Sequence, residues 1–227
     1  MSRAGGPDIR VLEDPAAEVA RLLGETARAG GHVVLTGGSS PKRAYEMAAA
    51  AGEDWSRATL WFGDERCVAP DDERSNFAMA DAALLSRLDP VPAVQRIEGE
   101  RGATEGAAAY EASVREALGD APAWDLLLLG LGPDSHCASL FPNRPEKDVD
   151  DRLVVGVPEA GMEPFVPRVS LTLPALNAAK RVVFLVTGES KRDAVRRAFV
   201  DEDPASPSAR VRPAGELLVL LDAAAKP

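Results

Sequence analysis

Short apolar runs alternate along the chain with Ala-rich segments whose apolar positions recur at helical spacing, a pattern that predicts strands and helices in turn. The predicted strands cover residues 9–12, 32–36, 59–62, 125–129, 153–157, 182–186 and 217–221. The predicted helices cover residues 15–29, 41–51, 76–85, 104–118, 174–177 and 191–199. Several strands are apolar on both faces, which is typical of a parallel sheet between helices. The pattern therefore predicts an α/β fold, with a mostly parallel sheet flanked by helices on both faces.

Length and composition favour a single soluble domain. The chain has 227 residues, of which 45% are hydrophobic and 27% charged, so it can bury a full core without disulfides. The longest apolar runs, at 126–129, 182–186 and 217–221, are too short to span a bilayer, and no export signal is visible. We expect one α/β domain over residues 1–227, located in the cytoplasm. Residues 201–212, rich in Pro, Ser and Asp, are expected to form an exposed loop.

The charge balance narrows the range of ligands. The formal net charge is −10, which argues against binding to nucleic acid or to an anionic membrane, because both favour a basic face. An anionic small molecule is compatible with this charge if the positive charge is local. Cys67 and Cys137 are too few for a disulfide framework and are expected to be free thiols. Each adjoins a candidate site residue, but neither has the sequence context of a catalytic nucleophile.

Polar segments follow three of the predicted strands, where α/β sheets usually bind ligands. The first segment reads TGGSSP, with Gly37, Gly38, Ser39 and Ser40 before a proline at the expected start of a helix. Its glycines allow backbone N–H groups to approach a ligand, its hydroxyls add donors, and the helix N-terminus attracts anions. Phosphate suits such a loop. A simple turn with Ser40 as the helix N-cap is the alternative.

The second segment places three charges directly after an apolar strand. Asp64, Glu65 and Arg66 come first, and Ser75 and Asn76 follow within an acidic loop. A solvated surface loop would account for such a run of charges. Its position beyond a strand instead favours a role for Arg66, whose guanidinium can hold a phosphate or a developing oxyanion.

The third segment, LGLGPDSHCASLFP over residues 129–142, carries the strongest indication of catalysis. The chain has two histidines, and only His136 lies in a Gly-rich loop after a buried strand, whereas His32 opens a strand and is expected to be structural. A histidine with an ordinary pKa near 6.5 can accept a proton from water at neutral pH and return it later. Asp134 can orient the imidazole or help to bind the substrate, although an Asp-x-His pair alone is also common in turns.

Together the three segments resemble the 6-phosphogluconolactonase family. Its members carry a GGSTP-like loop, a DER followed by SN, a GxGxDGHxASLFP stretch, an RxT and a late GxxK. The corresponding positions here are 37–41, 64–66 with 75–76, 130–142, Arg168, and Gly188 with Lys191. The match spans nearly the whole chain in the same order. The resemblance implies a Rossmann-like sheet of the sugar-phosphate isomerase and deaminase type.

The resemblance also implies hydrolysis of 6-phospho-D-glucono-1,5-lactone to 6-phospho-D-gluconate in the pentose phosphate pathway. His136 is the expected general base, with Asp134 and Arg66 as its catalytic partners. The residues expected to bind the substrate are Gly37, Gly38, Ser39, Ser40, Asp64, Asn76, Arg168 and Lys191. No cofactor is expected, and one well-placed histidine is too few for a catalytic zinc site. The expected partner is a small phosphorylated lactone, with no nucleic acid or membrane, and the chain is expected to be a monomer or weak homo-oligomer.

Two positions depart from the family pattern, and two other functions stay open. Ser170 replaces a threonine and keeps its hydroxyl, whereas Ser135 replaces a glycine that either adopts a positive φ or leaves room for the substrate.

A non-catalytic sugar-phosphate sensor that lost turnover through Ser135 is one alternative. A glucosamine-6-phosphate deaminase is the other. Two features of the sequence argue against a deaminase. The residues after His136 read CASLFP rather than the IAFNEP-like pattern of the deaminases, and Arg66 stands where the deaminases carry an aromatic residue.

Overall fold

Seven strands form the central sheet of the computed structural model, which describes residues 6–227. The strand order is β1-β10-β9-β6-β2-β3-β5, and every pairing is parallel. The bounds are β1 Asp8–Val11, β2 His32–Leu35, β3 Thr59–Phe62, β5 Ala93–Val94, β6 Leu126–Leu129, β9 Arg181–Val186 and β10 Glu216–Leu221. All four residues of β6 are buried, as a central strand covered on both faces requires. The predicted α/β fold is confirmed, with β5 as a short additional edge strand.

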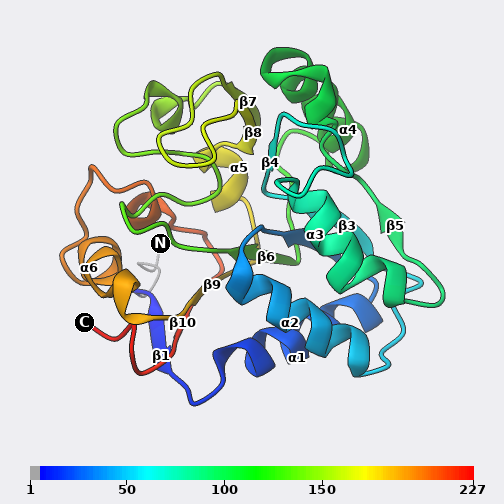
Figure 1. Cartoon of the computed structure of the whole chain (residues 1–227), viewed down its shortest axis with the longest axis horizontal. Helices are drawn as coiled ribbons and strands as arrows, with labels where there is room; N and C mark the ends of the chain where they lie inside the picture. Colours follow the sequence, from blue (N-terminus) through cyan, green and yellow to red (C-terminus); the bar gives the residue numbers. More distant parts are fainter. Residues whose placement is uncertain (1–5) are drawn as a thin grey trace.

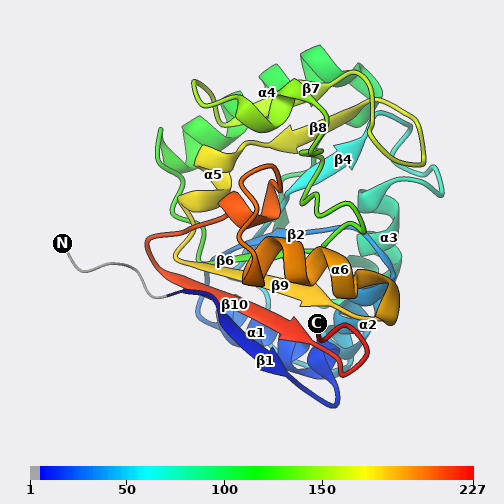
Figure 2. The same ribbon diagram turned by 90° about the vertical axis from the view of Figure 1, so that its left-hand side faces the viewer.

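Helices cover both faces of this sheet, and Figure 2 shows α1 and α6 on opposite sides of β9 and β10. The bounds are α1 Pro15–Arg28, α2 Ser39–Ala50, α3 Asn76–Ala83, α4 Ala103–Leu118, α5 Leu173–Asn177 and α6 Arg192–Val195. The helix predicted over 191–199 is present in three parts, because a 3₁₀ turn at Glu189–Lys191 precedes α6 and a π-helical turn at Arg196–Val200 follows it. Within residues 6–227, no helix is long and apolar enough to cross a membrane.

A second, antiparallel sheet of three strands lies beside the carboxyl ends of the main sheet, and it corrects the sequence prediction (Figure 1). It contains β4 Asp64–Arg66, β8 Arg168–Leu171 and β7 Val154–Val157 in the order β4-β8-β7. The strand predicted over 153–157 therefore exists, but it is not part of the parallel sheet. Helix α4 packs against β7 and β8, so the small sheet has its own apolar cover.

Two further predictions are wrong in detail. Helix α2 begins at Ser39 with Gly38 as its N-cap, so Pro41 is not its first residue and Ser40 is not its cap. Residues 201–212 form an exposed loop only in part, since residues 201, 202, 204 and 205 are exposed, whereas residues 206–209 are buried and Ser206 and Ser208 have no solvent exposure. Their polar composition suggested exposure. In the folded chain, however, the Ser206 hydroxyl and the Ser208 N–H both donate to the carbonyl oxygen of Ser135 at 3.3 Å.

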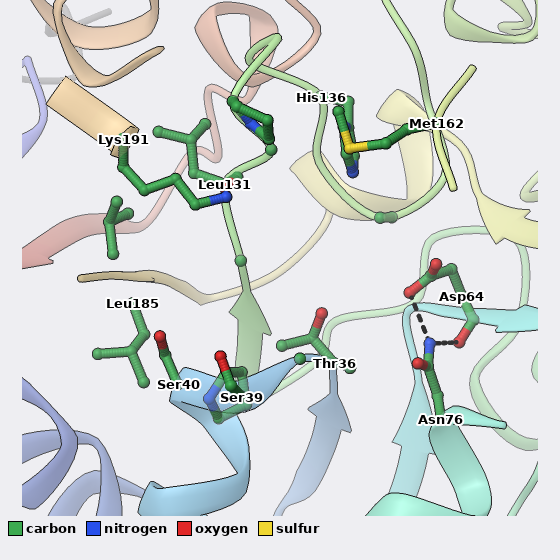
Figure 3. Close-up of a pocket in the computed structure, with 18 of the residues that line it drawn as sticks. Thr36, Ser39, Ser40, Asp64, Asn76, Leu131, His136, Met162, Leu185 and Lys191 are labelled. Carbon is green, nitrogen blue, oxygen red and sulfur yellow. Dashed lines mark hydrogen bonds between the residues drawn. The ribbon is translucent and has the colours of Figure 1, made fainter. Parts of the chain in front are cut away.

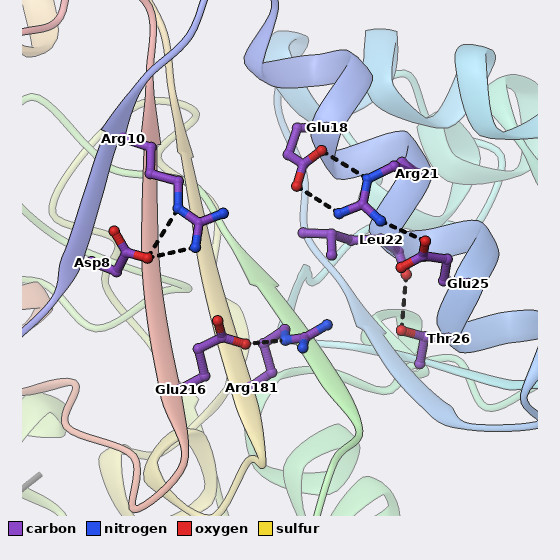
Figure 4. A network of polar contacts seen from close by, with 9 residues as sticks. All are labelled: Asp8, Arg10, Glu18, Arg21, Leu22, Glu25, Thr26, Arg181 and Glu216. Carbon is purple, nitrogen blue, oxygen red and sulfur yellow. Dashed lines mark hydrogen bonds and ion pairs between the residues drawn. The ribbon is translucent and has the colours of Figure 1, made fainter. Parts of the chain in front are cut away.

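Most charged side chains form a solvated surface away from the strand ends that carry the candidate chemistry. Figure 4 shows such pairs on β1, on α1 and between the first residues of β9 and β10, including Arg21 between Glu18 and Glu25, and Arg181 with Glu216. All of these side chains are at least a fifth exposed, and exposed ion pairs contribute little to stability because water and salt screen them. These ion pairs contain many of the charged residues of the chain, and they do not indicate a ligand.

Candidate active site

A cavity of about 240 Å³ opens at the carboxyl ends of β2, β6 and β9, three adjacent strands of the main sheet. Strand β3, which follows β2 in the chain, lies on one side of β2 in the sheet. Strands β9 and β10, which follow β6, lie on the opposite side of β6, so the direction in which strands are added reverses between β2 and β6. Ligands of open α/β sheets bind at such reversals. The cavity is lined by every residue predicted for the site except Asp134, which lies behind His136. Figure 3 shows Ser39, Ser40, Asp64, Asn76, His136 and Lys191 around this space.

His136 is held in place from behind by Asp134. The Asp134 carboxylate oxygen Oδ1 lies 2.6 Å from His136 Nδ1 and accepts a hydrogen bond from the His136 backbone N–H at 3.1 Å. Burial raises the pKa of Asp134, but the hydrogen bond and charge of His136 outweigh it, so the pKa lies below its ordinary value. Asp134 is therefore a carboxylate at neutral pH and fixes the tautomer of His136 with the proton on Nδ1. Nε2 then carries the free lone pair.

The first turn of α2 presents its backbone N–H groups to the cavity. Gly38, the N-cap, has φ 114° and ψ 168°, a conformation that is essentially restricted to glycine. Ser39 and Ser40 also line the cavity, and the Ser40 hydroxyl lies 2.5 Å from that of Thr187 after β9. The first four N–H groups of a helix have no partner within it and attract anions. This end of α2 is thus an anion cradle.

Three cationic side chains line the same cavity in a chain of net charge −10. Lys191 donates from Nζ to the carbonyl oxygen of Leu131 at 2.7 Å, and burial lowers the pKa of its ammonium group. Arg66 donates from Nη1 to the carbonyl oxygen of Arg74, and its Nε is buried with no partner among the described residues. The positive charge is therefore local, as an anionic ligand requires.

Arg168, the third cation, is 4% exposed and faces Arg66 across the β4–β8 pair. Its Nε donates to the carbonyl oxygen of Val166, and its Nη2 donates to those of Pro164 and Met162. Burial lowers the pKa of Arg168, and the positive charge of Arg66 adds to this effect. Two of its three nitrogens are thus occupied in holding the segment that brings Met162 and Glu163 into the cavity wall.

Asp64 and Asn76 form a fixed polar wall opposite Lys191. Asp64 is 5% exposed and accepts hydrogen bonds from the Ser139 hydroxyl at 2.6 Å and from Asn76 Nδ2 at 3.2 Å. Glu65, which points away from the cavity, accepts from the backbone N–H groups of Asn76 and Phe77 at 2.7 Å. Glu65 therefore caps α3 and fixes Asn76, so the acidic run is buried structure rather than a solvated loop.

Ser135 adopts the backbone conformation expected of the glycine that it replaces. Its φ is 69°, in the left-handed region, and its side chain is fully buried and does not line the cavity. The Ser135 hydroxyl donates to the carbonyl oxygen of Asp134. Of the two reasons for a glycine here, the positive φ is confirmed, and the serine takes no room from a ligand.

Ser135→Gly is accordingly expected to leave kcat/KM unchanged. Removing the side chain relieves roughly 1–2 kcal/mol of left-handed strain, but it also loses one hydrogen bond and adds about 0.5–1 kcal/mol of unfolded-chain entropy. The change in Tm is therefore expected to be small. Parallel rate and calorimetric measurements on the two proteins check this. A variant that turns over substrate while the parent does not would instead support the sensor alternative.

The thiols and the carboxylates suggest no second kind of chemistry in the described residues. Burial, with Glu65 nearby, raises the pKa of Cys67 to about 11, and burial raises that of Cys137 to about 12. Neither thiol lines the cavity, so neither is placed as a nucleophile. Over residues 6–227, no group of three His, Cys, Asp or Glu side chains is close enough together to hold a metal ion.

The cavity also contains residues that the sequence did not single out. Thr187, Met162 and Glu163 line it alongside the predicted set. Thr187 immediately follows β9, and the rule applied to the other three strands would have selected it.

Strand β8 reads Arg-Val-Ser-Leu, an alternation in which Val169 packs toward α4 and Ser170 accepts from the Ser139 N–H at 3.1 Å. That period of two was the available signal for the small sheet.

Comparison with known proteins gives a consistent result. A family model described as glucosamine-6-phosphate isomerases/6-phosphogluconolactonase matches residues 10–220. The 6-phosphogluconolactonase of Nostoc sp. is 41% identical over 201 residues, covering 85% of this chain and 82% of the relative. The crystal structure of the 6-phosphogluconolactonase from Thermotoga maritima superposes with a TM-score of 0.81 at 30% identity, covering 95% of this chain and 99% of that one.

The fold alone does not separate the two activities named by the family model. A monomeric glucosamine-6-phosphate deaminase superposes with a TM-score of 0.82 at 18% identity, covering 97% of this chain and 98% of that one. At that identity the likeness shows a shared fold only. The sequence match, in contrast, extends over most of the chain and includes the segments around His136 and the anion cradle. The chain therefore belongs to the family of glucosamine-6-phosphate isomerases and 6-phosphogluconolactonases.

Proposed function

We propose that this chain hydrolyses 6-phospho-D-glucono-1,5-lactone to 6-phospho-D-gluconate in the pentose phosphate pathway, without a metal ion and with His136 as general base. The observation that carries the proposal is the 2.6 Å contact between His136 Nδ1 and Asp134. This contact leaves Nε2 as a proton acceptor in a cavity that also contains an anion cradle. The relatives named above as lactonases support the choice of substrate.

In the proposed reaction, His136 moves one proton in each direction. Nε2 takes a proton from water as the water oxygen bonds to the lactone carbonyl carbon and the carbonyl electron pair moves onto its oxygen. Collapse of the tetrahedral intermediate breaks the bond from that carbon to the ring oxygen, which receives the proton from Nε2. The Asp134 carboxylate stabilises the imidazolium that forms between the two steps. The new carboxylic acid then ionises to solvent.

The remaining residues bind and position the substrate. The phosphate lies on the N-terminus of α2, at residues 37–40, with Lys191 beside it, because this is where unpaired N–H groups and a cation face the same space. Arg66 stabilises the oxyanion, because its guanidinium group lines the same cavity as His136. Asp64 and Asn76 contact sugar hydroxyls. Arg168 contributes mainly by holding the wall at Met162 and Glu163.

A direct assay separates this proposal from the two alternatives. Purified protein with a chelator present is expected to hydrolyse the lactone well above the spontaneous rate and to release no ammonia from glucosamine 6-phosphate. Ammonia release would establish the deaminase. Binding of 6-phosphogluconate without turnover of the lactone would establish the sensor. Loss of turnover in the chelator, restored by a divalent cation, would contradict a metal-independent mechanism.

The affinity for the product 6-phosphogluconate is expected to fall as the pH rises through the lowered pKa of Lys191. The protonated ammonium attracts the phosphate, and burial places its loss at a lower pH than the ordinary lysine value of about 10.4. Isothermal calorimetry across the alkaline range measures the effect. In Lys191→Arg the side chain keeps its charge over that pH range, so the affinity is not expected to fall as the pH rises. The same pH dependence in both proteins would rule out Lys191 as the titrating group.

We also propose that residues 1–227 act as one domain in the cytoplasm, as a monomer or weak homo-oligomer. The cavity supports the first part of this proposal, since it is lined by residues from 36 to 191 of one chain. Sedimentation of the purified protein tests the state of assembly. A tight dimer would contradict it.

A further inference from the structure

The loop that carries His136 is tied to a distant C-terminal segment at one backbone carbonyl group, that of Ser135. The His136 carbonyl accepts from the Gly132 N–H at 2.9 Å, within the loop. The Ser135 carbonyl accepts from the Ser206 hydroxyl and from the Ser208 N–H, both at 3.3 Å. Ser135, Ser206 and Ser208 all have no solvent exposure, so water does not replace these bonds.

The bond from Ser206 acts on one particular peptide group, the one that joins Ser135 to His136. Its carbonyl end is held by the C-terminal segment, and its N–H end donates to Asp134 Oδ1 at 3.1 Å. A peptide group is planar, so fixing one end fixes the direction of the other. Asp134 Oδ1 is also the atom that contacts His136 Nδ1. The orientation of this plane therefore sets the alignment of the carboxylate on the imidazole.

The residue that precedes this peptide plane has a strained backbone. Ser135 has φ 69°, a conformation that costs a residue with a Cβ about 1–2 kcal/mol. Rotation of this peptide changes ψ of Ser135 and φ of His136, so it would break the Asp134 contact to the His136 N–H. The donors from residues 206 and 208 oppose that rotation.

We propose that Ser206 is a positioning residue for catalysis, acting through the Ser135–His136 peptide to keep Asp134 aligned on His136. Ser206 does not line the cavity and touches no reacting atom. Its effect is therefore expected in kcat and not in KM. This inference rests on the proposed role of His136 as general base.

Ser206→Ala is expected to lower kcat about threefold to tenfold, the rate equivalent of one hydrogen bond, with KM unchanged. Ser206→Thr keeps the hydroxyl and is expected to restore most of the rate. Ser208→Ala removes a buried hydroxyl from the same segment but keeps the backbone N–H that donates to Ser135. Ser208→Ala therefore measures how much kcat falls when a buried serine of this segment is truncated to alanine. The fall in kcat of Ser206→Ala is compared with that value.

A double-mutant cycle with Asp134→Asn separates positioning from a general loss of structure. If Ser206 acts through Asp134, Ser206→Ala lowers kcat in the parent and has little further effect in the Asp134→Asn background. Equal losses in both backgrounds, a rise in KM alone, or a loss no larger than that of Ser208→Ala would overturn the proposal.

Hydrogen exchange at the His136 amide gives a readout that does not depend on turnover. In the parent this N–H donates to Asp134 and is expected to exchange slowly, whereas Ser206→Ala is expected to speed its exchange more than Ser208→Ala does. Unchanged exchange in Ser206→Ala would contradict the locked peptide. If the parent shows no lactonase turnover while the exchange result holds, the proposed function fails and the structural part of the inference stands.

Discussion

His136→Gln is expected to lower kcat for the lactone by about 10²- to 10⁴-fold, the range that general base catalysis typically contributes. Glutamine keeps a polar side chain of similar length, but its amide accepts no proton at neutral pH. The Gly37–Ser40 loop and Lys191 lie on other elements, so KM and product affinity are expected to change little. Initial rates measure the effect, after subtraction of the spontaneous opening of the lactone, which continues without the enzyme.

His32→Gln is the matched control, since His32 is the other histidine of the chain. It is the first residue of β2, at the end of that strand opposite the cavity, and its Nδ1 accepts from Trp61 Nε1 at 3.1 Å. Its substitution is expected to cost some stability and no activity. If His136→Gln retained most of the parent's kcat, or if His32→Gln lost as much, His136 would not be the base.

Gly132→Ala is expected to reduce kcat nearly as far as His136→Gln does, although it adds only a methyl group. A Cβ at this position would lie 2.0 Å from His136 Nδ1 and 2.6 Å from Asp134 Oδ1. Both distances are far below van der Waals contact, so the methyl group must displace the imidazole or separate it from its carboxylate. A misplacement of about 1 Å in a catalytic group can cost about 10²-fold in rate. Rates and a Tm measured on the same preparation test this prediction.

Gly63→Ala is the control for adding a methyl group to a buried glycine at the end of a strand. Gly63 follows β3, and its Cβ would meet nothing closer than 3.5 Å, at the Leu35 carbonyl oxygen. This variant is expected to keep its activity. A Gly132→Ala variant that matched Gly63→Ala in kcat would show that the imidazole has another productive position.

The sequence alone determined the elements and the location of the chemistry along the chain. Runs such as 126–129 are apolar throughout, so their strands were predicted within one residue of the observed bounds. Polar residues directly after β2, β3 and β6 predicted the anion cradle, the Asp64–Arg66 run and His136, because parallel strands present their carboxyl ends at one edge. These features depend on local pattern, which a sequence contains in full.

The tertiary structure decided which segments meet. Pairing between β2 and β6 brings residues 36–40 and 130–136 together, and strand order depends on long-range contacts that no local pattern specifies. The same holds for the small sheet, where Arg66 and Arg168 become neighbours across β4 and β8. It holds for Ser206 as well, which a polar segment appeared to place in solvent. A hydroxyl can be buried without a large loss of stability only where it forms a hydrogen bond in the folded chain. The acceptor for Ser206 is the Ser135 carbonyl, which lies 71 residues away in the chain.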